Sequence, residues 1–178
     1  MGSAFPFCSA ARAGYDLRMQ SYAGPQRFFV EFDAAEACPF TFTDDPVVIL
    51  FFASWAYSVE FGGTHELANA AMHLRRVYKL DLKPIVKYAD RNVEGEADRR
   101  EMERSWQPAV DLAACARAIA NAWDHPDERL APLIEGYEHL APRLLELATM
   151  CDWAAARDAR VRMSFDLETQ ERHAERPR

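Results

Sequence analysis

The longest apolar stretch of the sequence runs from Pro46 to Phe61 and carries no charged residue until Glu60. Asp45 stands before it as a suitable N-cap, and proline suits a first helical turn because its missing N–H would be unpaired there in any case. The stretch is apolar on every side, which indicates burial on every side. It is also shorter than the roughly 20 residues that a membrane-spanning helix needs. The pattern therefore predicts a central core helix and no membrane contact.

One part of this stretch has a second interpretation. Val47–Phe52 taken alone has the β-branched and aromatic composition of a buried strand. Length favours the helix, because the apolar pattern continues past Trp55 and buried strands are short. The strand stays open as the alternative.

Near the two ends of the chain, apolar and polar residues alternate as they do in strands with one buried face. Phe28, Val30 and Phe32 share a face in the first pattern, residues 161–167 form a second, and residues 40–43 form a short third. We expect the first two to pair. The predicted fold is a mainly α, helical bundle-like single domain with a small antiparallel β element formed near the two termini, and an α+β fold is the alternative.

Between these ends, apolar residues recur at helical spacing in segments separated by glycine, proline or charged turns. Thr64 is the expected cap of the first segment, and Asp127 is a candidate cap after the turn at residues 124–127. The charged segment 94–104 is typical of a solvated helix surface. The predicted helices cover residues 64–78, 83–90, 94–104, a segment that follows Pro108 and ends at Trp123, 130–140 and, after a break or kink at Pro142, 144–151.

Composition adds the expected domain organisation and class of protein. The 178 residues are 49% hydrophobic and 28% charged, which is typical of a soluble globular protein. Residues 1–25 predict an irregular arm, residues 26–168 a single globular domain, and residues 169–178 a charged tail. The net charge of −7 argues against nucleic-acid binding, which needs a basic face. The acidity favours solubility first and a basic protein partner second. The oligomeric state does not follow from the sequence.

The four cysteines are Cys8, Cys38, Cys115 and Cys151, and no two of them form a C-x-x-C pair. The N-terminus has no basic segment followed by an apolar one, as a signal peptide would. Cys115 and Cys151 fall on apolar helical patterns and are typical of small core residues. We therefore expect a reducing, cytoplasmic location.

The usual phosphate-loop, dinucleotide and serine-hydrolase motifs do not occur in the chain. The strongest remaining candidate for chemistry is a transition-metal site formed by His65 and Glu66 from one predicted helix with Glu135 and His139 from another. Imidazole and carboxylate groups are suitable ligands for zinc, iron or manganese. The competing interpretation, which we favour, is that these four are surface or boundary residues that cap helices and pair with arginines.

A second candidate is a ligand pocket at the end of the long apolar stretch, with Glu60 as a carboxylate of altered acidity and Trp55 as part of an apolar lining. The competing interpretation is a helix-terminal Glu60 that reaches water, with Gly62 as the C-cap. Trp55 is then ordinary core filling.

Two functions fit these observations. The first is a noncatalytic cytoplasmic binding protein, such as an inhibitor or immunity-type partner of a basic protein, with no cofactor. The second is a metal-dependent helical-bundle enzyme that uses the histidines and glutamates named above. The absent motifs and the acidity favour the first.

Overall fold

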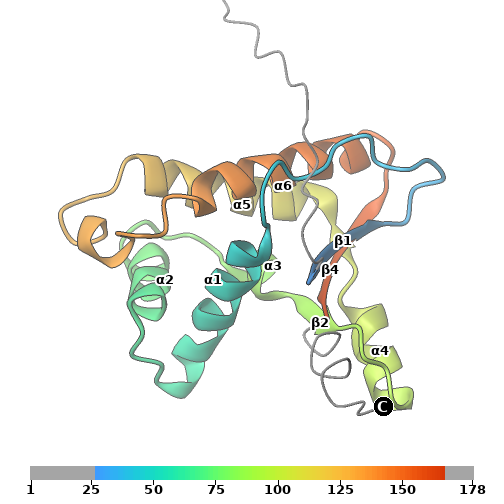
Figure 1. Ribbon diagram of the computed structural model, residues 1–178, viewed down its shortest axis with the longest axis horizontal. Coiled ribbons are helices and arrows are strands. Elements are labelled where there is room, and N and C mark those ends of the chain that lie inside the picture. Colours follow the sequence, from blue (N-terminus) through green and yellow to red (C-terminus); the bar gives the residue numbers. More distant parts are fainter. Residues whose placement is uncertain (1–26, 167–178) are drawn as a thin grey trace, which may run out of the picture.

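The computed structural model describes residues 27–166 (Figure 1), and within them six α-helices are combined with four short strands. A mainly α fold with some β structure is thus confirmed. The predicted arm (residues 1–25) and the predicted tail (residues 169–178) lie outside the described residues, and the domain boundaries stay a prediction. The elements are β1 (Phe28–Phe32), α1 (Val47–Ser58), η1 (Val59–Phe61), α2 (Glu66–Arg76), α3 (Lys83–Val86), β2 (Tyr88–Asp90), α4 (Glu96–Arg104), β3 (Gln107–Pro108), α5 (Ala109–Asp124), η2 (Ala131–Leu133), α6 (Leu140–Ala155) and β4 (Arg160–Phe165).

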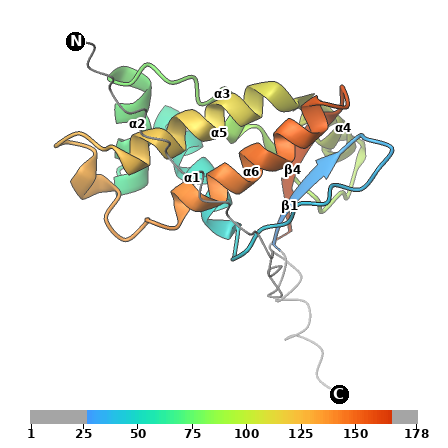
Figure 2. The same ribbon diagram turned by 90° about the horizontal axis from the view of Figure 1, so that it is seen from above.

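The two longest helices, α5 and α6, lie side by side and run in opposite directions (Figures 1 and 2). Each contributes a stripe of fully buried residues at helical spacing, with Leu112 and Ile119 on α5 and Leu144 and Leu147 on α6. At one end of this pair lie α1 and α2, and at the other lie the sheet and α4. The α5–α6 pair is therefore the axis against which the rest of the chain packs.

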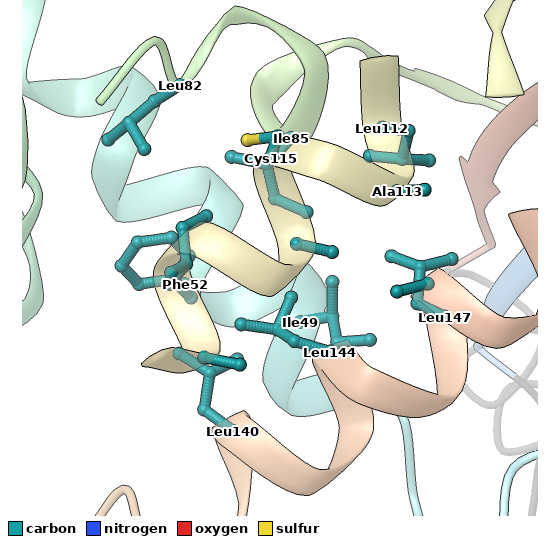
Figure 3. Close-up of a cluster of buried hydrophobic side chains, with 14 of the residues drawn as sticks. Ile49, Phe52, Leu82, Ile85, Leu112, Ala113, Cys115, Leu140, Leu144 and Leu147 are labelled. Carbon is teal, nitrogen blue, oxygen red and sulfur yellow. The ribbon is translucent and has the colours of Figure 1, made fainter. Parts of the chain in front are cut away.

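The apolar stretch forms α1, so its helical interpretation is confirmed and the strand alternative is wrong. Asp45 accepts a hydrogen bond from the Val47 N–H at 2.9 Å, and the helix begins at Val47. Ile49 and Phe52 are fully buried and point into the cluster formed with α5 and α6 (Figure 3). Burial on every side is wrong, however, because Phe51 is 43% exposed.

The strand β4 is the centre of the sheet. It pairs antiparallel with β1, placing Phe28 opposite Phe165, which confirms the predicted pairing of the two segments. The sheet as a whole is mixed, since β2 pairs with β4 in parallel and β3 pairs with its first two residues. Because β2 and β3 come from the middle of the chain, a purely antiparallel element near the termini is an incomplete description.

Three local predictions need correction. Residues 40–43 form no strand, because Thr43 donates its N–H and hydroxyl to Glu146 rather than to a neighbouring strand. The helix expected over 83–90 ends at Val86, and the chain then continues into β2. Pro142 does not break α6, since it lies in the first turn, where a missing N–H is tolerated.

The chain that follows α2 contains a left-handed residue that is not glycine. Lys79 has φ +57°, and the N–H of the next residue, Leu80, donates to the carbonyl of Leu74 at 3.1 Å, which holds this turn against the end of α2. Glycine is the usual residue at this position because a Cβ costs roughly 1 kcal/mol there. The chain therefore holds a lysine at this point at some cost to stability.

One partly buried carboxylate, that of Glu31, connects β1 to β4 and to the residue that follows β2. Glu31 on β1 accepts hydrogen bonds from Arg162 at 3.0 Å and from Ser164 at 3.1 Å, and Arg91 lies 3.6 Å away. Burial raises the pKa of Glu31, but the hydrogen bond and charge of Arg162, with smaller contributions from Arg91 and Ser164, outweigh it. The net result is a pKa below the ordinary value of 4.5.

Glu31 should therefore make the fold less stable in acid. A lowered folded pKa adds stability above the unfolded pKa, and this stability is lost as pH falls through the folded pKa. We expect the free energy of unfolding, measured with urea, to fall less between pH 7 and the acid range in Glu31→Gln than in the wild type. Glu128→Gln, at an exposed glutamate outside the sheet, is the control and should keep the wild-type pH dependence. An unchanged pH dependence in Glu31→Gln would contradict the assignment.

Candidate binding site

Of the four predicted metal ligands, two lie at the start of α2 and two lie in or next to the turns before α6. His65 is the N-cap of α2, and its Nδ1 accepts the N–H of Leu67 at 3.1 Å, so that nitrogen is already occupied. Glu66 is exposed in the first turn of the same helix. Within residues 27–166, no three His, Cys, Asp or Glu side chains are close enough to hold a metal ion. The metal site stays a prediction, which elemental analysis of the purified protein would test.

The premise that Glu135 and His139 share a helix face is wrong. Gly136 with φ +85° interrupts the expected helix, so only η2 forms and residues 134–139 are a series of turns. Both Glu135 and His139 are exposed in or next to these turns. The helical spacing used to bring them together therefore does not apply.

The two predicted pocket residues near the end of α1 have separate neighbours. The ring of Trp55 stacks on His65 with 4.2 Å between centroids. Glu60 is exposed and lies 3.8 Å from Arg75, and Gly62 with φ +80° caps the turn that follows. Neither residue lines the cavities described below. Their role in ligand binding stays a prediction.

An aromatic cluster ties the turns 134–139 to α1 and α2. Phe51 lies 5.7 Å from His65 and 6.2 Å from Tyr137, measured between ring centroids. The carbonyl of Tyr137 in turn accepts a hydrogen bond from the indole N–H of Trp123 at 3.1 Å. These contacts fix the turns against the C-terminal end of α5, and so they shape the cavity at that end.

The segment that enters the same region is fixed by a second anchor. His73 on α2 lies 2.8 Å from the carboxylate of Asp127, which also accepts the N–H groups of Arg129 and Leu130. The hydrogen bond from His73 is the main cause of the lowered pKa of Asp127. Asp127 therefore caps the turn at residues 128–130, but the helix that it was predicted to begin does not form, and the N-cap of η2 is Leu130. The contact of Asp127 with His73, 54 residues away, had no signal in the sequence.

The cavity itself lies between the end of α5, η2 and the start of α6, and its volume is about 600 Å³. Its wall carries three carboxylates, those of Asp124, Glu135 and Glu138, and no basic side chain. The remaining lining is apolar and includes Trp123 and Ile134. A cavity of this kind is complementary to a positively charged group attached to an apolar stem.

One of the three acids, Glu138, is held in its ionised form by the backbone. Glu138 accepts the N–H of Gly136 at 2.9 Å, and this bond to the backbone is the largest cause of a pKa below the ordinary value for glutamate. The turn at Gly136 thus orients the carboxylate and stabilises its ionised form. Of the three acids, only Glu135 was singled out from the sequence, and then for another role. The acids of residues 124–138 lie in a segment with two prolines, and their spacing follows neither the helical nor the strand period.

Comparison with known proteins gives no further guide. No protein-family model matches the chain, and no curated protein or solved structure is similar to it. Among the described helices, none is by itself long and apolar enough to cross a membrane. Only α1 with η1, taken together with the sharply bent continuation into α2, reaches the required length and composition.

Proposed function

We propose that this protein is a noncatalytic binding protein whose partner is a basic protein. The observation that carries the proposal is the cavity at the end of α5, whose lining combines three carboxylates with apolar residues and contains no basic residue. An inhibitor or immunity-type protein is the class that this arrangement fits best, since such proteins act by covering a charged surface of their partner. The overall charge of −7 supports the same choice.

An arginine of the partner is the side chain best suited to the cavity. Its guanidinium group forms paired hydrogen bonds with carboxylates, and its planar face and aliphatic stem pack on apolar surface. Asp124, Glu135 and Glu138 supply the acceptors, and Trp123 and Ile134 supply the floor. Of the floor residues, Trp123 is 6% exposed, so an entering side chain would contact only a small part of the indole ring.

The proposal includes a cytoplasmic location. The described cysteines, Cys38, Cys115 and Cys151, are free thiols, and free thiols persist in reducing compartments. Burial raises the pKa of Cys115 and of Cys151 to about 12, so both are neutral core residues rather than nucleophiles.

The test uses an arginine-rich peptide with a fluorescent label and measures its affinity by fluorescence polarisation. Replacing the three acids together, by Asp124→Asn, Glu135→Gln and Glu138→Gln, should weaken binding about tenfold at low ionic strength, because the charge-assisted hydrogen bonds are lost. The matched control removes three charges from the other end of the molecule, by Glu94→Gln, Glu96→Gln and Glu101→Gln. This control should change the affinity less than twofold.

An equal loss of affinity in both triple variants would show that the peptide responds only to total charge, and would contradict the proposal. The natural partner should form a stoichiometric complex in a native pull-down with the wild type. The same complex should be lost with the cavity variant and retained with the control.

A further inference from the structure

A second groove of about 610 Å³ lies beside the N-terminal half of α5, and its charge is opposite to that of the acidic cavity. One wall is formed by the end of α2, α3 and the residues around them, which carry Lys79, Lys83 and Lys87. The floor is one face of α5, formed by Ala114, Cys115 and Ala118. All three lysines are exposed, so their ammonium groups are accessible to a ligand.

The distribution of lysine in the chain sets this groove apart. Of the 21 basic residues only three are lysines, and all three fall between residues 79 and 87 and line this one groove. Everywhere else the chain uses arginine. One of the three, Lys79, occupies the left-handed position where glycine would be more stable. Lysine thus occurs here although the rest of the chain uses arginine, and at residue 79 although the left-handed backbone favours glycine.

These lysines form no ion pair among the described residues. Every ion pair there has an arginine or a histidine as its cation. Lys87 donates to the carbonyl of Trp106 at 2.8 Å, which leaves two further N–H donors. The carboxylate of Asp81 also lines the groove and accepts the backbone N–H of Lys83 at 3.0 Å.

The start of α5 adds to the positive potential. This helix has 16 residues, it follows Pro108, and no side chain caps its first turn within the described part of the chain. The positive end of the helix dipole therefore lies at the groove, where Pro108 is part of the lining, and Asp111 in the first turn offsets part of it. The effect supports the lysines and is secondary to them.

The floor of the groove is uncharged. Its two alanines have small side chains that leave room for a ring on α5, and the thiol of Cys115 donates to the carbonyl of Asp81 at 3.4 Å. Burial raises the pKa of this thiol to about 12, so it carries no charge beside a ligand. Asp111 is an exposed acceptor on the same helix and suits a hydroxyl or amino group.

From these observations we propose that the groove binds a small organic phosphate of nucleoside-diphosphate size. The three ammonium groups hold the phosphates, the alanine floor holds the ring, and Asp111 accepts a hydrogen bond from a sugar hydroxyl or a base amine. Lysine is a common phosphate ligand in proteins, and the volume lies in the range of small-molecule sites. The proposal does not depend on the basic partner, because the two cavities share no residue.

The experiment is isothermal titration calorimetry of the full chain with ADP, inorganic pyrophosphate and citrate in magnesium-free buffer at low salt. We expect ADP to bind more tightly than pyrophosphate, and citrate to bind most weakly. Each of Lys79→Gly, Lys83→Ala and Lys87→Ala should weaken ADP binding about tenfold, because a charge-assisted contact is lost. Lys79→Gly suits the left-handed backbone, so it removes the charge without disturbing the end of α2.

The matched control is Arg99→Ala with Arg100→Ala, which removes exposed positive charge from α4, far from the groove in sequence. It should leave ADP binding within twofold of the wild type. Absence of ADP binding at millimolar concentration, or equal weakening by the α4 variant, would overturn the site. Citrate binding as tight as that of ADP would overturn the assignment to phosphate, and equal affinities for ADP and pyrophosphate would overturn the role of the floor.

Discussion

Replacing Phe52 with alanine is expected to destabilise the protein by about 3–5 kcal/mol, because it removes a fully buried ring from the centre of the core. Phe52 packs edge-on against Trp123 with 5.4 Å between ring centroids, and it lies among residues of α5 and α6 (Figure 3). These helices are long and held by many other contacts, so they cannot close the space that the ring leaves. The loss should appear as a lower urea midpoint with an unchanged slope.

The neighbouring residue provides the control. Phe51 is on the same helix and of the same type, but it is 43% exposed. Phe51→Ala should cost about 1 kcal/mol, since less area is removed from contact and water can fill the space. If both variants unfolded at the same urea concentration, the orientation of α1 described above would be incorrect.

Removing residues 160–178 is expected to abolish cooperative unfolding altogether. The deletion takes away β4, the strand with which β1, β2 and β3 all pair, and with it the fully buried side chains of Val161 and Met163. Each such side chain contributes about 1.5–3 kcal/mol. With the backbone pairs of the sheet also lost, the total approaches the stability of an ordinary domain of about 5–15 kcal/mol.

The measurement is thermal unfolding followed by circular dichroism. The control deletes only residues 167–178 and therefore leaves every backbone pair of β4 in place. The longer deletion should show no sharp transition, whereas the shorter one should keep it. A sharp transition in the longer deletion, at the wild-type temperature, would mean that the sheet contributes little to folding.

Hydrophobic periodicity predicts those elements whose apolar residues in the sequence are the same residues that the fold buries. The helix α1 could be predicted because its apolar stretch is too long for a buried strand and starts at a clear capping residue. The pairing of β1 with β4 could be predicted because both segments alternate cleanly and each has one apolar face. In both cases the local sequence pattern and the tertiary contacts favour the same backbone conformation.

The errors fall where a tertiary contact overrides the local pattern. Residues 40–43 alternate as a strand does, but the ring of Phe42 packs against Phe28 and the hydroxyl of Thr43 donates to Glu146. These contacts hold the segment in a conformation in which it does not pair with a strand. Tyr88–Asp90 has only three residues and starts directly after the short helix α3, so its sequence is too short to show the alternation of a strand. It becomes a strand because the edge of β4 offers backbone partners.

The two cavities could not be predicted from spacing. Each is formed by segments that meet only after α5 and α6 have packed, and the acidic residues of the first lie in turns without a period. The three lysines were not singled out from the sequence, where acids stand between basic residues, and only the structure brings them to one side of a groove with α5 as its floor.

The direction of α5 gives the acidic cavity a consequence for the stability of the helix. Asp124 is the last residue of α5, and the last turn holds no basic residue, so a negative charge lies at the negative end of the helix dipole. Such a placement opposes the dipole by roughly 0.3–1 kcal/mol. The N-terminal end differs, because Asp111 in its first turn has the favourable sign. A cation bound in the acidic cavity would therefore also relieve the repulsion at the C-terminal end and stabilise α5.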